Sequence, residues 1–323
     1  MNKMQANGKD SAQAAPYRYI YLFLLGALVL LALLFAVSGS LDMVEDFAPP
    51  ERVNWLYLGL ALASNLAFWL ATAVSWQVAI HRITAVRMSI LYSFAQVALV
   101  MVGKYLPGKV WGLAMRGKDM TNLGISHYQV LVCSQVEQVV SIHAGLSIGA
   151  AGWLALEQPP YWQLALVVVG LVPFAGSFLN NTGMGWVARV LGKVWPSLQL
   201  SDHKISAPTY LVLFVLYLVE WVTVGAILYF LWLAVFEPVL DPVMAAHVIA
   251  ANAVAFLVGF VAVFAPGGVG IREGVLVSLL AASLGLPEAI YISVLFRIWL
   301  VITDGVAGLL SLKIIGSNAR TGA

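Results

Sequence analysis

The stretch VGKYLPGKVWG, residues 102–112, interrupts a chain that is otherwise strongly apolar. An uncharged run leads into this stretch, and two lysines, Lys104 and Lys109, then flank a Pro-Gly pair. A related stretch, VFAPGGVGIREG, occurs at residues 263–274. Because proline followed by glycine ends or kinks a helix, we expect each stretch to divide a long helical segment in two.

The composition places the chain in a membrane. Of its 323 residues, 61% are hydrophobic and only 10% are charged, and the mean hydropathy is +0.90. These values are far from those of a soluble domain. The single cysteine, Cys133, excludes an intrachain disulfide and a cysteine-based metal cluster. We therefore predict an all-α polytopic membrane protein with no cofactor and no metal site.

Hydropathy predicts six full spans and two broken segments. Six apolar runs are long enough to cross about 30 Å of hydrocarbon: residues 20–37, 55–80, 126–156, 161–179, 206–236 and 289–312. Two further segments, residues 88–117 and 242–284, contain the Pro-Gly breaks. Each of these returns the chain to the side it came from, either as a re-entrant hairpin or as a pair of full spans.

The charges between the spans predict one orientation. Acidic residues dominate the first connection, residues 42–52, which we place outside. Basic residues gather in the connections that we place inside, at Lys3, Lys9, Arg18, Arg82, Arg87, Arg116, Lys118, Arg189, Lys193, Lys204, Lys313 and Arg320. By the positive-inside rule both termini lie in the cytoplasm.

The order of the spans predicts a duplication. Residues 53–160 and residues 206–315 each contain a span, a broken segment and a span, and residues 161–205 contain a linking span and a cytoplasmic amphipathic loop. Residues 1–52 hold the N-terminal tail, the first transmembrane helix and an outer loop, and residues 316–323 form the C-terminal tail. Because one linking span separates the copies, they have opposite orientations. Such an inverted repeat with discontinuous helices is typical of transporters that bind substrate near the membrane midplane.

The two breaks supply the candidate substrate-binding residues, which are Lys104, Lys109, Gly267, Gly268, Gly270, Arg272 and Glu273. Broken helices expose N–H groups that favour anions, and glycine lets the backbone approach a ligand closely. The guanidinium of Arg272 is suited to bidentate contact with phosphate. In the alternative interpretation, the two lysines extend to the headgroups and the Pro-Gly pair only turns a hairpin.

Four charged residues within the predicted spans are candidates for coupling or gating: Glu137, Glu220, Arg297 and Asp304. An isolated charge at a helix centre costs roughly 2.5 to 3.5 kcal/mol on insertion scales, so we expect these groups to pair. Arg297 and Asp304 lie about two helical turns apart on one face, and can pair with other helices while lining one cavity. For Glu220 and Asp304 the alternative is an ion pair that only locks the bundle.

No catalytic motif is present. The G-x-S-x-G pattern at residues 145–149 lies inside an apolar segment, where spaced glycines indicate helix packing rather than a nucleophile. Phosphate-loop and dinucleotide-binding patterns do not occur, and no feature indicates nucleic acid.

Three stretches carry a resemblance to a known family: GKYLPGKVWGLAMRG (103–117), APGGVGIREGVLVSLLAASLGL (265–286) and SVLFRIWLVITDGVAG (293–308). They resemble the transmembrane region of lysylphosphatidylglycerol synthetases, over roughly residues 55–312. The resemblance implies movement of aminoacylated phospholipid between leaflets. The soluble domain that performs aminoacylation in full-length members does not occur in this sequence, so we expect a stand-alone member. Glu137-Gln138 stands where the family often has Glu-Arg.

We therefore expect a flippase or transporter, not an enzyme, in a bacterial or archaeal cytoplasmic membrane. Its substrate is a phosphate-bearing lipid: a phospholipid, an aminoacylated phospholipid or a polyprenyl-linked lipid. The expected partners are this lipid and either a second copy of the chain or envelope-lipid synthesis enzymes. Two alternatives stay open: an integral-membrane enzyme acting on lipid phosphates, and a non-transporting partner of an envelope-lipid synthase. With no nucleotide site, the driving force is a lipid gradient or protons.

Overall fold

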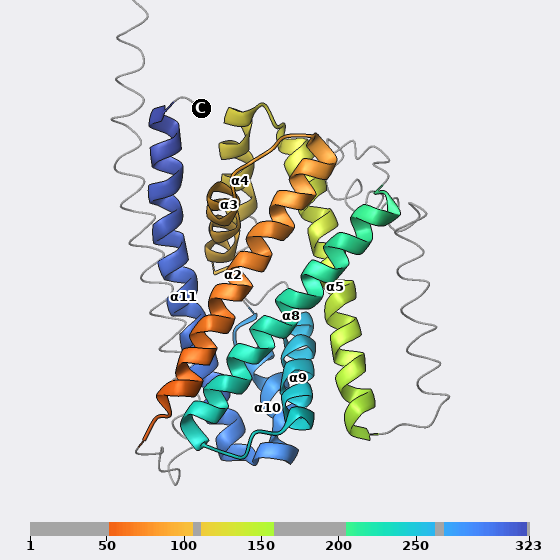
Figure 1. Cartoon of the computed structure of the whole chain (residues 1–323), viewed down its shortest axis with the longest axis vertical. Helices are drawn as coiled ribbons and strands as arrows, with labels where there is room; N and C mark the ends of the chain where they lie inside the picture. The colour runs from red at the N-terminus through yellow and green to blue at the C-terminus, as the bar shows by residue number, and fades with distance from the viewer. Residues whose placement is uncertain (1–51, 106–110, 158–204, 262–267, 322–323) are drawn as a thin grey trace, which may run out of the picture.

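The computed structural model describes residues 52–105, 111–157, 205–261 and 268–321 (Figure 1). All regular elements in these ranges are helices. Four described helices are long and apolar enough to cross a membrane: α2 (Trp55–Thr84), α8 (Ala207–Phe236), α9 (Pro242–Val261) and α11 (Leu286–Thr321) over its Leu286–Gly316 part. Helix α5 (His127–Glu157) is 31 residues long but carries polar side chains at Gln135, Glu137 and Gln138. The described chain is thus an all-helical, multi-pass membrane protein.

The predicted spans at residues 55–80, 206–236 and 289–312 are confirmed as long apolar helices. Residues 126–156, predicted as a span, form α5, which is helical but is not among the four described helices that are apolar enough to cross a membrane. The runs at residues 20–37 and 161–179 lie outside the described residues.

Helices α2 and α8 are matched in length and in how they begin and end. Each has 30 residues, and each begins at a side-chain N-cap, Asn54 for α2 and Ser206 for α8. Each ends at a non-glycine residue in the left-handed region, Ala85 (φ 61°) and Glu237 (φ 48°). The two helices lie side by side and run in opposite directions through the bundle (Figure 1).

The first broken segment folds into a hairpin of two short helices, α3 (Ile90–Gly103) and α4 (Trp111–Met120), which pack against each other. With 14 residues α3 is about 21 Å long, too short to cross about 30 Å of hydrocarbon alone. Two glycines bring the arms together: a Cβ on Gly103 would lie 2.3 Å from the backbone nitrogen of Gly112. Only glycine allows this approach. A 3₁₀ turn, η1 (Thr121–Leu123), then leads to α5.

The second broken segment consists of α9 and α10 (Ile271–Leu284), which also pack against each other. A Cβ on Gly268 would lie 3.2 Å from the carbonyl oxygen of Gly259, and Gly268 has a φ of +71°. This glycine pair has the same sequence spacing as Gly103 and Gly112. In Figure 1 the first hairpin occupies the upper half of the bundle and the second the lower half, so they approach the middle from opposite ends.

The G-x-S-x-G pattern serves helix packing, as expected. A Cβ on Gly145 would lie 2.8 Å from the indole of Trp221, and one on Gly149 would lie 2.9 Å from Val254. These glycines therefore set close contacts of α5 with α8 and α9.

Candidate functional site

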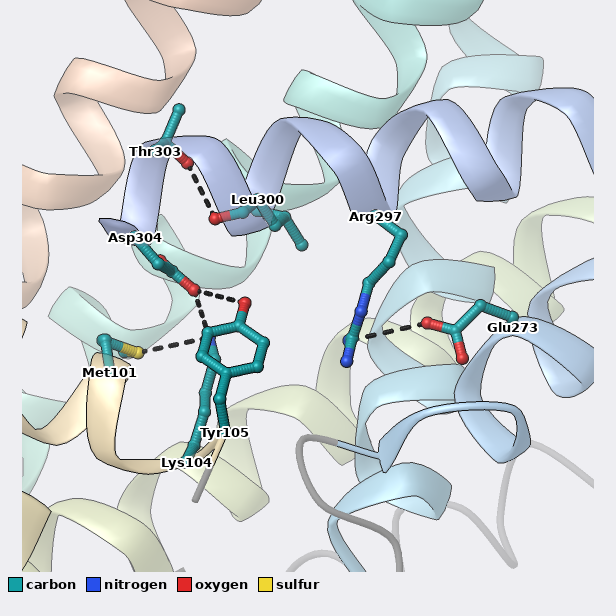
Figure 2. A network of polar contacts seen from close by, with 8 residues as sticks. All are labelled: Met101, Lys104, Tyr105, Glu273, Arg297, Leu300, Thr303 and Asp304. Atoms are coloured by element: carbon teal, nitrogen blue, oxygen red, sulfur yellow. Dashed lines mark hydrogen bonds and ion pairs between the residues drawn. The ribbon is translucent and has the colours of Figure 1, made fainter. Parts of the chain in front are cut away.

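The tip of the first hairpin contacts the middle of α11. The Lys104 ammonium lies 2.7 Å from the Asp304 carboxylate, and the Tyr105 hydroxyl donates to the same carboxylate at 2.7 Å (Figure 2). The side chain of Asp304 is 3% exposed. Asp304 thus anchors the end of α3 inside the bundle.

The start of α10 contacts α11 two turns away from this anchor. One oxygen of Glu273 accepts from the backbone N–H of Gly270 at 2.7 Å, which caps the helix. The other oxygen lies 3.5 Å from Nη1 of Arg297. The Arg297 guanidinium also lies 5.5 Å from the centre of the Tyr105 ring. Arg297 therefore lies between the tips of the two hairpins (Figure 2).

Arg272 is buried among aromatic rings rather than carboxylates. It is 4% exposed, and its guanidinium carbon lies 3.3 Å from the centre of the Phe256 ring and 5.1 Å from that of Phe296. Its Nη2 donates to Oδ1 of Asn252 at 3.5 Å. Among the described residues no carboxylate lies within ion-pair distance of Arg272.

We call Lys104, Arg272, Glu273, Arg297 and Asp304 the central cluster. It brings three basic and two acidic side chains together where the two hairpins meet. Over the described residues the cluster therefore carries one positive charge in excess. A buried excess charge is costly unless a ligand compensates it.

A second polar cluster lies along the first hairpin. Arg116 of α4 is 3% exposed, and its Nη1 lies 2.9 Å from Glu137 on α5. Its Nε donates to the carbonyl oxygen of Gln96 at 3.3 Å, and its guanidinium carbon lies 3.7 Å from the centre of the Trp76 ring. Unlike Arg272, Arg116 is neutralised by a carboxylate.

Two cavities adjoin these clusters. The larger, about 420 Å³, is lined by Arg116, Glu137, Tyr217 and Glu220 among others. The smaller, about 170 Å³, is lined by Lys104, Asp304 and Glu220 among others. Both contact Met101, Gln138, Ser141 and Glu220. The cavities thus lie side by side, the larger next to the Arg116–Glu137 pair and the smaller next to the Lys104–Asp304 pair.

The sequence was compared with models of known protein families. The model for the lysylphosphatidylglycerol synthase TM region matches residues 23–308. The chain belongs to this family. The match includes both hairpins and every residue of the two clusters, and it confirms the resemblance seen in the sequence. A search among curated proteins found no match. Membership of this family associates the protein with membrane lipids.

One residue of this family member was assigned wrongly from the sequence. Arg116 was predicted to be an inside loop charge, but it is buried and paired because α4 folds back into the bundle. The sequence does contain a pattern that could have identified Arg116 as a buried residue. Arg116 follows Gly112 at the spacing at which Arg272 follows Gly268, so aligning the two breaks on these glycines instead of the prolines pairs the arginines. The hydrogen bonds to Gln96 and Asn252 also join residues 20 apart in both cases.

The other predicted site residues are placed as follows. Lys104, Arg272, Glu273, Arg297 and Asp304 come together, while Gly268 and Gly270 (φ +82°) form the turn before α10. Lys109 and Gly267 lie outside the described residues. Lys104 pairs with Asp304 rather than extending to the headgroups. Arg297 and Asp304 pair with different hairpins, as their spacing on α11 suggested.

Glu137 and Glu220 belong to the cavities instead of the central cluster. Glu137 pairs with Arg116. Glu220 is 8% exposed and is hydrogen-bonded to Ser75 of α2 at 2.5 Å. No ion pair to Glu220 is found in the described part of the chain, so the pairing expected for it is not observed there.

Proposed function

We propose that this protein moves a phosphate-bearing lipid between the two membrane leaflets, and that the lipid phosphate binds at the central cluster. The observation that carries the proposal is the excess positive charge at the meeting point of the two hairpins. The three basic groups there are Lys104, Arg272 and Arg297, and in the part of the chain that the structure describes two carboxylates face them.

Arg272 is the group that we assign to the phosphate. It is buried, stacked on Phe256, and hydrogen-bonded to the neutral Asn252 through a long contact of 3.5 Å. A planar guanidinium can donate two parallel hydrogen bonds to phosphate oxygens. Gly268 and Gly270 place the N-terminal end of α10 beside it, and the amide dipoles of that end favour a negative charge.

Access from both sides follows from an inverted repeat, which is part of this proposal. Several features support it: the equal lengths of α2 and α8, the equally spaced glycine pairs, and the opposite entry of the two hairpins (Figure 1). In such an arrangement the site stays near the midplane while one repeat rocks against the other.

The ion pairs on α11 provide a means of gating in this scheme. The Lys104–Asp304 contact of 2.7 Å and the Arg297–Glu273 contact of 3.5 Å hold the two hairpin tips against α11. An entering phosphate competes with these carboxylates for the same two cations. We propose that this exchange of partners loosens one hairpin and lets the cavity open to the other side.

Transport is tested with the purified protein in liposomes. We would follow the transbilayer movement of labelled phosphatidylglycerol, aminoacyl-phosphatidylglycerol and polyprenyl phosphate, with a phosphate-free glycolipid as the negative control. The variants are Arg272→Gln and, as a matched control, Arg82→Gln at an exposed end of α2. We expect one phosphate lipid to move, and only Arg272→Gln to lose the movement. Movement that Arg272→Gln leaves unchanged contradicts the proposed site, and chemical conversion of the lipid by purified protein favours an enzyme instead.

A further inference from the structure

Glu220 differs from the other acidic side chains that face the cavities and the central cluster. It lies near the middle of α8, is 8% exposed and lines both cavities. Glu137, Glu273 and Asp304 each pair with a basic side chain. In the described ranges Glu220 has no such partner. An ionised Glu220 is therefore an uncompensated charge inside the bundle.

The contact with Ser75 bears directly on whether Glu220 holds a proton. The Ser75 Oγ lies 2.5 Å from Oε1 of Glu220 and 3.0 Å from the carbonyl oxygen of Ala71. A serine hydroxyl has a single hydrogen, so it cannot donate fully to both oxygens. If Glu220 is protonated, its O–H donates to Ser75 and Ser75 donates to Ala71. A proton on Glu220 therefore lets both contacts be full hydrogen bonds at the same time.

The surroundings of Glu220 also favour its neutral form. Helices α2, α5, α9 and α11 pack against α8. The titratable or charged groups that face the two cavities are Arg116 from α4, Glu137 from α5, Tyr217 from α8, Lys104 after α3 and Asp304 from α11. From α2 and α9 only neutral side chains face them, namely Phe68, Thr72, Phe256, Leu257 and Phe260. Ser75 of α2, which contacts Glu220, is also neutral.

These charges leave no cation for Glu220. Arg116 is paired with Glu137 and Lys104 with Asp304. An ionised Glu220 would give the cavity walls a negative charge in excess, whereas protonation makes the lining neutral. Burial and a nearby carboxylate both disfavour the charged form of an acid.

We propose that Glu220 is a proton-binding site and that its protonation is coupled to lipid movement, a coupling that rests on the function proposed above. The proton passes between a Glu220 oxygen and water in the adjoining cavities, which at about 420 and 170 Å³ have room for several water molecules of about 30 Å³ each. The ionised carboxylate repels a phosphate-bearing headgroup and the protonated acid admits it. A proton and an anionic headgroup therefore move in the same direction.

The proton site is tested by infrared spectroscopy of the purified full chain. At neutral pH the wild type should show the carbonyl stretch of a protonated carboxylic acid, and Glu220→Gln should lack it. Glu237→Gln, at the exposed end of the same helix, is the matched control and should keep it. Ser75→Ala should keep the band but shift it to higher frequency, because the acid loses its hydrogen-bond acceptor. A spectrum that Glu220→Gln leaves unchanged overturns the proton site.

The coupling is tested separately in liposomes with an imposed pH gradient. Lipid movement toward the alkaline side should accelerate several-fold in the wild type and in Glu237→Gln. Glu220→Gln should still move lipid but without this acceleration. A wild type that moves lipid at the same rate with and without the gradient overturns the coupling. A wild type that moves no lipid overturns the proposed function and the coupling with it, while the infrared result still decides the proton site.

Discussion

Arg116 and Arg272 occupy corresponding places in the two hairpins and differ in what surrounds them. Both are almost fully buried, both stack on an aromatic ring, and both contact a residue 20 positions earlier in the chain. Arg116 has Glu137 at 2.9 Å, whereas no carboxylate pairs with Arg272 in the described ranges. The comparison suggests that one arginine stabilises the fold and the other is available to an anionic ligand.

The largest effect should come from breaking the Arg116 pair. Arg116→Met leaves the Glu137 carboxylate buried without its cation, and we expect a loss of about 3 to 5 kcal/mol in the free energy of unfolding. The double variant Arg116→Met/Glu137→Leu removes both charges and should recover most of the loss. Denaturant unfolding in detergent measures both. If the single and double variants are equally stable, the Arg116–Glu137 ion pair is not what makes Arg116 important for stability.

Adding a methyl group where a hairpin is tightest should cost about 1 to 3 kcal/mol. In Gly103→Ala the new Cβ would lie 2.3 Å from the backbone nitrogen of Gly112, and backbone cannot move aside as a side chain can. Gly59→Ala in α2 is the control, because no atom lies within 4 Å of its Cβ position. Thermal unfolding compares the two variants. A Gly103→Ala protein as stable as the control would contradict the close approach of α3 and α4.

Arg272→Met should affect stability less than Arg116→Met, because it leaves no carboxylate without its cation and removes a positive charge from the central cluster. We expect a loss of less than about 2 kcal/mol, chiefly from the stacking on Phe256. The same unfolding assay measures it. An Arg272 variant that is as unstable as Arg116→Met would show that both arginines serve the fold.

The smallest effects should come from the C-terminal ends of α2 and α8, which have the same left-handed backbone conformation. Ala85→Gly and Glu237→Gly place glycine at positions with φ of 61° and 48°. Because glycine adopts the left-handed region without steric cost, each should gain up to about 1 kcal/mol in stability. A gain at one position and a loss at the other would show that the two ends are not equivalent.

The sequence predicted the features that depend on local pattern. Hydropathy located α2, α8 and α11, and the Pro-Gly breaks located the two divided segments, for which a hairpin was one of two forms expected. The spacing of Arg297 and Asp304 suggested that both face one site, and both contact the hairpin tips. These predictions succeeded because apolar run length, helix breakers and helical periodicity act over short distances in the chain.

Features that depend on tertiary packing were missed. A charge soon after an apolar run is read as a loop residue, so the burial of Arg116 on a folded-back helix was not expected. The Ser75–Glu220 contact joins residues 145 positions apart, and the Tyr105–Asp304 contact joins residues 199 apart. No local pattern specifies such pairs. Aligning the two hairpins on their glycines would have singled out Arg116, but not its partner Glu137.

The most direct test of the central claim is the affinity of the purified protein for a phosphate-bearing lipid. We would titrate wild type, Arg272→Gln and Arg82→Gln in detergent with phosphatidylglycerol and with a phosphate-free glycolipid. Hydrogen bonds to charged groups contribute about 1.5 to 3 kcal/mol. We therefore predict that only Arg272→Gln weakens phosphatidylglycerol binding, by about tenfold or more, and that it leaves glycolipid binding unchanged. Equal phosphatidylglycerol affinity in all three proteins would contradict it.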